Sequence, residues 1–161
     1  MKVLVTGGAG FIGSHVTERL VGAGHEVAVL DDLSTGRLEN LNDVRGDVEV
    51  IRGDVADAPT VARAVAGRDA VVHLAAVASV KASMEEPLRT HRTNLTGSVQ
   101  LFEAAARSGV ERVVYASSAA VYGEAAELPI AEDAPKRPMS PYAIDKLAGE
   151  QYLAHYHRAG A

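Results

Sequence analysis

The sequence predicts an α/β fold in which a doubly wound parallel sheet carries helices on both faces. Short apolar runs alternate along the chain with stretches of helical spacing, which is the pattern of consecutive βαβ units. The first apolar run breaks into glycines before a helical pattern begins, and an acidic residue follows the second run. Five such runs joined by right-handed crossovers predict the strand order 3-2-1-4-5.

Composition limits the class of protein. At 161 residues the chain is long enough for one domain, which we expect to span residues 1–161. A net charge of -5 argues against a surface for nucleic acid or an anionic membrane. The absence of cysteine excludes disulfides and thiolate zinc sites, and we expect no metal. Met1-Lys2 leads straight into an apolar run, and no run is long enough to span a membrane, so we expect a cytoplasmic protein.

The first predicted strand, Val3–Val5, ends in a glycine-rich turn, and a helix follows over about Phe11–Val21. The turn fits the dinucleotide-binding fingerprint as Gly8-x-Gly10-x-x-Gly13 and as Gly7-x-x-Gly10-x-x-Gly13. Its glycines allow a sharp turn, a close approach of backbone amides to a pyrophosphate, and tight packing of helix on strand. The start of the helix would attract the phosphates. The candidate cofactor residues here are Gly7, Gly10, Phe11, Ile12 and Gly13.

The second predicted strand, His25–Leu30, ends in two acidic residues, Asp31 and Asp32. Asp31 lies roughly 20 residues beyond the turn, where a carboxylate accepts hydrogen bonds from the adenosine ribose. Because such a carboxylate repels a 2′-phosphate, the sequence favours NAD over NADP. NADP remains an alternative cofactor, because the guanidinium of Arg37 could reach a 2′-phosphate.

A third predicted strand, Val48–Ile51, leads to Asp54 and Val55. Asp54 could meet the adenine amino group, with Val55 as an apolar wall. Taken alone, Asp54 is better interpreted as the N-cap of a helix over Thr60–Ala66, with Asp57 as the rival cap.

The fourth predicted strand, Asp69–Ala76, contains His73, which we interpret as a core histidine rather than a base. Small residues at its carboxyl end leave space for a ligand. A long helix over Thr90–Arg107 follows, and Asn94 on this helix looks solvated from spacing alone. The candidate cofactor residues at the strand end are Leu74, Ala75 and Ala76.

The fifth predicted strand, Val110–Ala116, leads to Ser118. A surface loop over Glu124–Met139 precedes the last helix, on which Tyr142 and Lys146 lie one turn apart. A tyrosine is a poor base at neutral pH, but a nearby ammonium and an oxidised nicotinamide favour its phenolate. If the helix packs over the sheet, the Ser118 hydroxyl can share a hydrogen bond to a substrate oxygen.

Together these motifs resemble the extended short-chain dehydrogenase/reductase family, and within it the nucleotide-sugar epimerases of the UDP-glucose 4-epimerase type. The resemblance runs along the whole chain and implies a Rossmann-type fold with NAD as cofactor. The matching segments are Thr6–Gly13, Asp31–Gly36, Gly53–Val55, His73–Ala76, Asn94–Gly97, Ser117–Gly123 and Ser140–Lys146.

The resemblance also implies roles for the candidate residues. Tyr142 would be the base at the sugar 4-hydroxyl, Ser118 would hydrogen-bond that oxygen, and Lys146 would hold the nicotinamide ribose. Asp54 and Val55 would hold adenine. Such enzymes pass a hydride from sugar C4 to NAD, rotate the 4-keto intermediate and return the hydride to its other face.

Further expectations come from comparing this sequence with the family pattern. Asn94 would lie near the active-site end of the cofactor. Ala119-Ala120 lacks the acidic residue that 4,6-dehydratases and decarboxylases carry there, which favours epimerisation. Asp145 stands where the family commonly has serine, and it could pair with Lys146 and weaken the effect of the lysine.

Family members continue beyond the region of Ala161 with a smaller substrate domain. We therefore expect this chain to be the cofactor-binding part, inactive in isolation, with a UDP-sugar as the substrate of the whole enzyme. The alternatives are a non-catalytic NAD-binding module and a reductase of the same family. The family also implies a homodimer through two helices, with Phe102, Tyr152 and Tyr156 on a partly apolar outer surface.

Overall fold

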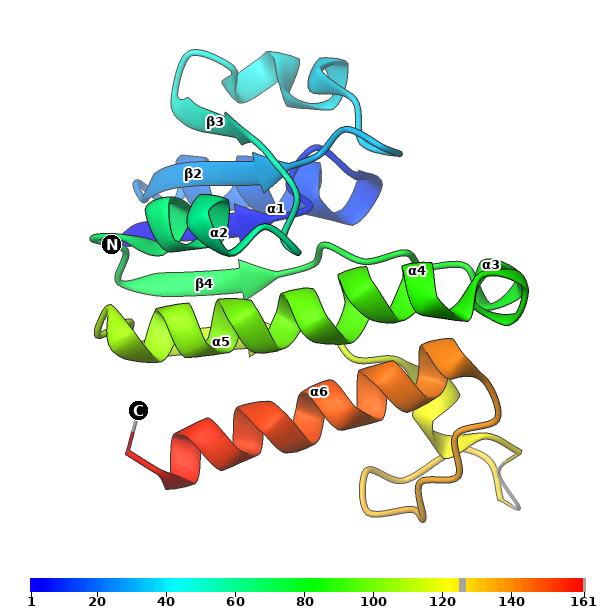
Figure 1. The fold of residues 1–161 in the computed structure, drawn as a ribbon. Helices are drawn as coiled ribbons and strands as arrows, with labels where there is room; N and C mark the ends of the chain where they lie inside the picture. The colour runs from blue at the N-terminus through cyan, green and yellow to red at the C-terminus, as the bar shows by residue number, and fades with distance from the viewer. Residues whose placement is uncertain (125–126, 161) are drawn as a thin grey trace.

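The computed structural model describes residues 1–124 and 127–160 and confirms the predicted fold class (Figure 1). All four strand pairings are parallel, and the strand order is β3-β2-β1-β4-β5, as the sequence predicts. The strands are β1 (Lys2–Thr6), β2 (Glu26–Asp31), β3 (Val48–Arg52), β4 (Ala70–His73) and β5 (Arg112–Tyr115).

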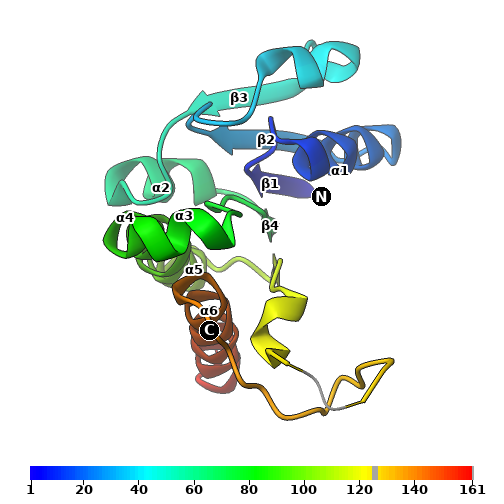
Figure 2. The ribbon, with the colours of Figure 1, turned by 90° about the vertical axis from the view of Figure 1, so that its right-hand side faces the viewer.

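Helices cover both faces of the sheet (Figure 2). On one face lie α1 (Phe11–Gly22) and the short 3-10 helix η1 (Leu38–Val44). The other face carries α2 (Ala58–Val65), α5 (Gly97–Arg107) and α6 (Pro141–Arg158). This two-sided cover explains why the strands read as nearly continuous apolar runs, because parallel strands are buried on both faces.

The core is divided between the two faces by the alternation of side chains along each strand. Leu4 and Val71 point towards α2 and α5, where they pack with Leu101. Val3 and Val5 point the other way, towards the α1 side. On that second face Val114 of β5 stays 52% exposed, so the α1 side is left partly open at this edge of the sheet.

The long helix that the sequence predicts over Thr90–Arg107 is divided into segments. It consists of α4 (Pro87–His91), a π-helical turn η2 (Arg92–Thr96) and α5. A further short helix, α3 (Val80–Glu85), precedes it. Pro87 begins α4 because proline fits the first turn of a helix, where its missing N–H costs nothing.

One local expectation needs correction, and one short helix was not predicted. Asp57, not Asp54, caps α2, because its Oδ2 accepts a hydrogen bond from the backbone N–H of Thr60 at 3.1 Å. The polar stretch after β2 contains η1, whose Leu41 is fully buried.

The loop expected over Glu124–Met139 holds no helix or strand in its described residues, and positions 125 and 126 lie outside them. A 3-10 turn, η3 (Ala119–Tyr122), precedes it.

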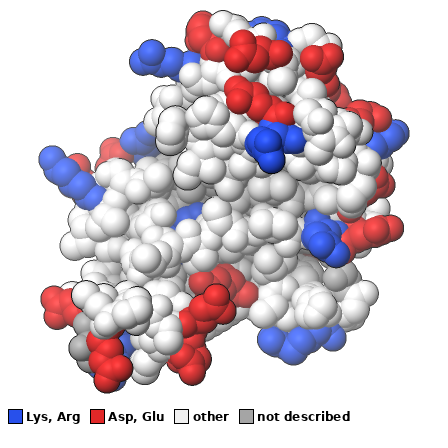
Figure 3. Space-filling view, turned by 180° about the vertical axis from the view of Figure 1, so that it is seen from behind, with Lys and Arg blue, Asp and Glu red and all other residues white. Residues whose placement is uncertain are grey.

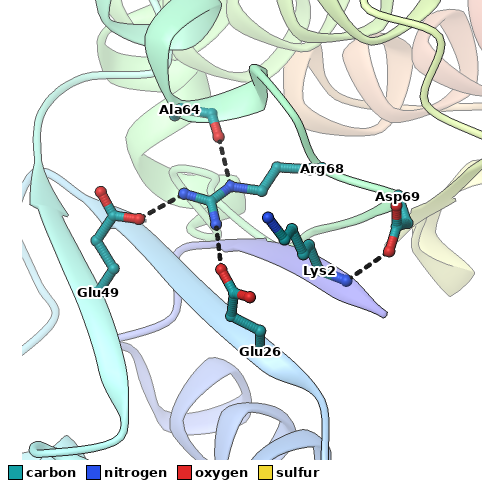
Figure 4. Close-up of polar contacts among 6 residues, drawn as sticks. All are labelled: Lys2, Glu26, Glu49, Ala64, Arg68 and Asp69. Atoms are coloured by element: carbon teal, nitrogen blue, oxygen red, sulfur yellow. Dashed lines mark hydrogen bonds and ion pairs between the residues drawn. The ribbon is translucent and has the colours of Figure 1, made fainter.

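Ion pairs tie the strands together at their amino ends (Figure 4). The Arg68 guanidinium reaches Glu49 of β3 at 2.5 Å and Glu26 of β2 at 3.9 Å, and its Nε donates to the carbonyl oxygen of Ala64 at 3.2 Å. Beside it, the Asp69 carboxylate accepts from the backbone N–H of Lys2. These contacts join the amino ends of the strands, which lie opposite their carboxyl ends.

Within residues 1–124 and 127–160, none of the helices combines the length and the apolar character that crossing a membrane requires. On the face shown in Figure 3, acidic and basic side chains lie mainly around the rim, and uncharged surface fills most of the middle.

Candidate active site

A pocket of about 500 Å³ lies at the carboxyl ends of the strands, on both sides of β1. In an open parallel sheet this is the switch point at which ligands bind, because consecutive connections leave the strands in opposite directions there. The predicted site residues that line the pocket are Gly7, Gly10, Phe11, Ile12, Gly13, Asp31, Asp32, Asp54, Val55, Leu74, Ala75, Ala76, Tyr142 and Lys146.

The glycine turn between β1 and α1 is packed so tightly that side chains cannot be added. Gly7 has a φ of +69°, and a Cβ there would lie 2.8 Å from the backbone nitrogen of Ala75. A Cβ on Gly13 would lie 2.0 Å from the carbonyl oxygen of Gly7. Gly10 caps α1 with no side-chain hydrogen bond, which leaves the first-turn amides of the helix for a ligand. The cradle therefore suits a phosphate group at the start of α1.

The Asp31 carboxylate forms one wall of the pocket and is fixed by two backbone amides. Its Oδ2 accepts from the N–H of Ala9 at 2.9 Å, and its Oδ1 accepts from the N–H of Leu33 at 2.8 Å. Each carboxylate oxygen has a further lone pair, so Asp31 can still accept hydrogen bonds from a ligand hydroxyl. Arg37, the residue that left NADP open, is exposed and is not part of the pocket lining.

Asp54 and Val55 lie at the end of the pocket formed by the turn after β3. The Asp54 Oδ1 accepts from the N–H of Ala56 at 2.8 Å, and its Oδ2 lies 3.4 Å from Nη2 of Arg92. Arg92 and Arg89 also line the pocket, and sequence reasoning missed both of them. No signal in the sequence could have found them, because the π turn that brings Arg92 to the pocket has no distinct spacing of its own.

A buried chain of hydrogen bonds fixes the end of β4. His73 Nδ1 lies 2.6 Å from Oγ1 of Thr6, and Nε2 lies 2.9 Å from Oγ of Ser98. Because Ser98 donates to the carbonyl oxygen of Asn94 at 2.5 Å, it must accept from Nε2–H of His73, and Thr6 must donate to Nδ1. Thr6 Oγ1 in turn accepts from the N–H of Ala75 in the pocket wall. Burial lowers the pKa of His73 to about 3, with a smaller contribution from the Lys146 charge, so His73 is the neutral core histidine that the sequence predicts.

Asn94 is buried, although spacing alone makes it look solvated. Its Oδ1 accepts from the N–H of Val77 at 2.8 Å, and its Nδ2 donates to the carbonyl oxygen of Val77 at 3.1 Å. The π turn aims Asn94 at this segment, and π turns of this kind occur often at functional sites. Asn94 is not part of the pocket lining, so it supports the pocket wall from behind.

Tyr142 and Lys146 reach the opposite wall of the pocket from α6. Ser140 starts this helix, since its Oγ accepts from the N–H of Ala143 at 3.2 Å. Lys146 Nζ donates to the carbonyl oxygen of Ala116 at 2.8 Å and lies 6.0 Å from the ring centroid of Tyr142. Burial lowers the pKa of Lys146 to about 8, and the Asp145 carboxylate partly opposes this shift. The pocket thus combines a phenol and a nearby ammonium.

Ser118 lies apart from this pair. Its Oγ accepts from the N–H of Ala120 at 3.2 Å and caps η3, and Ser118 is not part of the pocket lining. Within the described parts of the chain, no hydrogen bond joins Ser118 to Tyr142. The neighbouring Ser117 does line the pocket, and its hydroxyl donates to the Glu150 carboxylate of α6.

Asp145 does not pair with Lys146, which corrects the expectation from the sequence. Its Oδ1 accepts from Nδ1 of His91 at 2.8 Å. The two neighbours on α6 point in different directions, Asp145 towards α4 and Lys146 towards the strand end at Ala116. Among residues 1–124 and 127–160, no group of three or more candidate ligand side chains could hold a metal ion.

The sheet order, the glycine turn and the pocket at the switch point define a Rossmann-type fold. The chain belongs to the NAD dependent epimerase/dehydratase family, whose model matches residues 3–161.

Among its relatives is the UDP-glucose 4-epimerase of Mycolicibacterium smegmatis, which is 45% identical over 160 residues that cover 97% of this chain and 51% of the relative. A crystal structure of the Thermus thermophilus UDP-glucose 4-epimerase in complex with NAD is 48% identical. It superposes with a TM-score of 0.92 over 99% of this chain and 51% of that one. The Thermotoga maritima UDP-glucose 4-epimerase with UDP-glucose is 40% identical, with a TM-score of 0.92 over 98% of this chain and 52% of that one. The chain therefore spans about half the length of these relatives.

Proposed function

We propose that this chain is the NAD-binding half of a nucleotide-sugar 4-epimerase that acts on a UDP-sugar. The observation that carries the proposal is one pocket lined by the glycine turn, the Asp31 carboxylate and the Tyr142–Lys146 pair. Relatives solved with NAD and with UDP-glucose support the cofactor and the class of substrate.

The residues of the pocket fit NAD. The glycine turn and the uncapped start of α1 would hold the pyrophosphate. Asp31 would accept hydrogen bonds from the adenosine ribose and would repel the 2′-phosphate of NADP. Asp54 and Val55 would hold the adenine, and Lys146 would hold the nicotinamide ribose. Bound NAD would supply a reversible hydride acceptor next to Tyr142.

The chain's own residues would handle the proton. In the proposed reaction the Tyr142 phenolate removes the proton from the sugar 4-hydroxyl while the hydride leaves C4, and it returns the proton when the hydride returns. The Lys146 ammonium stabilises the phenolate by its charge. Ser118 would hydrogen-bond the same oxygen once a substrate is bound, since catalytic hydrogen bonds often tighten only then.

Epimerase activity would also need the part of the enzyme that holds the nucleotide-sugar. Misplacing reacting groups by about 1 Å costs on the order of 100-fold in rate, so the sugar must be held close to the cofactor. We therefore expect residues 1–161 alone to bind NAD and to turn over UDP-sugars negligibly.

The test is conversion of UDP-galactose to UDP-glucose by this chain extended with a C-terminal half of the kind its relatives carry. Tyr142→Phe should lower the rate by roughly 100-fold or more, because it removes the proton acceptor. Tyr152→Phe, which changes an exposed tyrosine on the same helix, should leave the rate unchanged. An extended chain that binds NAD but turns over no nucleotide-sugar would favour the non-catalytic module. NAD(H)-dependent reduction without epimerisation would favour the reductase.

We also propose a homodimer through the helices that follow β4 and β5. Exposed apolar side chains on α3, α4 and α6 support this surface, namely Met84, Leu88, Ile144 and Tyr152. The expectation that Phe102 belongs to it is wrong, because Phe102 is buried with 1% of its surface exposed. Light scattering should give the mass of two chains at tens of micromolar, and a strict monomer would contradict this proposal.

A further inference from the structure

The segment that follows β5 forms part of the pocket wall, although β5 lies at the edge of the sheet. Ala116 and Ser117 line the pocket together with Tyr142 and Lys146. In the sheet of the described residues β5 pairs with β4 alone. One more hydrogen bond, from the N–H of Ala116 to the carbonyl oxygen of His73 at 3.2 Å, continues this pairing. The position of Ser117 therefore depends on contacts outside the sheet.

Helix α6 approaches the end of β5 closely because a glycine lies at the point of contact. A Cβ on Gly149 would lie only 2.5 Å from the hydroxyl oxygen of Tyr115, so any side chain there would force the helix away. One turn earlier, Lys146 Nζ lies 4.8 Å from the ring centroid of Tyr115 and donates to the carbonyl oxygen of Ala116 at 2.8 Å. This close approach lets the next residue of the helix, Glu150, reach the pocket wall.

Glu150 holds the side chain of Ser117, whose hydroxyl donates to its Oε1. Hydrogen bonds to a charged acceptor are the stronger kind, and serine has a single O–H to give. Lys146 and Glu150 lie four residues apart, on one face of α6. They therefore hold two consecutive residues of the pocket wall, Ala116 by its backbone and Ser117 by its side chain.

Glu150 itself does not line the candidate pocket. It is half-buried and borders a second cavity of about 440 Å³ between α5, β5 and α6. Its charge therefore stays partly hydrated and needs no buried cation to compensate it. Because Glu150 contacts the pocket wall through Ser117 alone among the hydrogen bonds of the described residues, any effect on a ligand passes through that hydroxyl.

We propose that Glu150 is a positioning residue that orders the pocket wall after β5 by holding the Ser117 hydroxyl. In the proposed function, on which this part of the inference rests, the ordered wall faces the nicotinamide half of NAD, because Lys146 beside it holds the nicotinamide ribose. The direct consequence, the order of Ser117 and Ser118, does not depend on any ligand.

The first test measures that order in the ligand-free chain through NMR order parameters of the backbone amides. Glu150→Met keeps the length of the side chain and removes the acceptor. It should lower the order parameters of Ser117 and Ser118 from about 0.85, as in rigid backbone, towards the roughly 0.6 of flexible backbone. Glu150→Gln keeps an acceptor and should preserve them. Gln151→Met, an equal change at an exposed position of the same helix, should also preserve them. Unchanged values in Glu150→Met would overturn the proposal.

The second test compares the affinities for NAD and for ADP, which lacks the nicotinamide half. Glu150→Met should weaken NAD binding by about 5-fold, because the ligand must then order the wall itself, and should leave ADP binding unchanged. Glu150→Gln should restore the affinity for NAD. A residue that only stabilises the fold would change both affinities equally or neither, and either result would contradict the inference.

A double-mutant cycle tests whether Glu150 acts through Ser117. Ser117→Ala should weaken NAD binding, and adding Glu150→Met should cause no further loss, because the hydroxyl that Glu150 holds is already absent. Independent, additive losses would contradict the inference. If the unchanged chain does not bind NAD, the proposed function fails and the order parameters still decide this inference. If NAD binds and Glu150→Met leaves its affinity unchanged, this inference fails and the proposed function stands.

Discussion

His73 is a core residue whose hydrogen bonds connect the core to the wall of the pocket. It is fully buried, yet its two ring nitrogens link Thr6 of β1 to Ser98 of α5. Through Thr6 this chain of hydrogen bonds reaches Ala75 in the pocket wall, and through Ser98 it reaches Asn94 behind that wall. A core histidine therefore sets the backbone at the carboxyl end of β4.

His73 predicts how stability depends on pH. Its folded-state pKa of about 3 lies below the 6.5 of an unfolded chain, so below pH 6.5 the unfolded chain binds the extra proton. This contribution should therefore lower the free energy of unfolding as the pH falls from about 6.5 towards 3. Urea unfolding at pH 7 and at pH 5 measures the loss. His73→Asn should remove this part of the pH dependence, and an equal slope in both proteins would contradict it.

At the scale of elements, the sequence predicted the parts whose signals are local. The apolar runs give the five strands, and the glycines with Asp31 give the turn and the wall of the pocket. Asp57 has the capping role that the sequence favoured for Asp54, because only the geometry of the loop decides between two nearby acids. The π turn could not be predicted from the sequence, because its residues continue the helical pattern of the residues around it. The burial of Asn94 and the approach of Arg92 to the pocket both depend on that turn.

Arg68 offers a prediction for the amino ends of the strands. Its side chain is 10% exposed and joins β2, β3 and the end of α2. Arg68→Ala should lower the free energy of unfolding by about 1 kcal/mol or somewhat more, since Glu26 and Glu49 are exposed and such pairs are weak in water. Urea unfolding gives the value. The affinity for NAD should stay the same, because the pocket lies at the opposite, carboxyl ends of the strands. A weaker affinity would show that the two ends of the strands are coupled.

At the scale of the whole molecule, the Arg68 ion pairs and the candidate pocket lie at opposite ends of the strands. The ion pairs join the amino ends of β2 and β3 (Figure 4). The pocket lies at the carboxyl ends of the strands. Family membership explains why the sequence motifs and the geometry agree on this pocket. The sugar and its exact placement could not be predicted, because about half the length of the relatives has no counterpart in this chain.

Calorimetric titration of the chain with NAD measures whether the pocket binds NAD through the proposed contact with Asp31. We expect one NAD per chain, bound more tightly than NADP. Asp31→Ala should weaken NAD binding by about 1–3 kcal/mol, as expected for losing charge-assisted hydrogen bonds. Asp43→Ala, outside the pocket, should have no effect. A chain that shows no heat of NAD binding, prefers NADP, or binds NAD equally well without the Asp31 carboxylate would contradict the proposed NAD site.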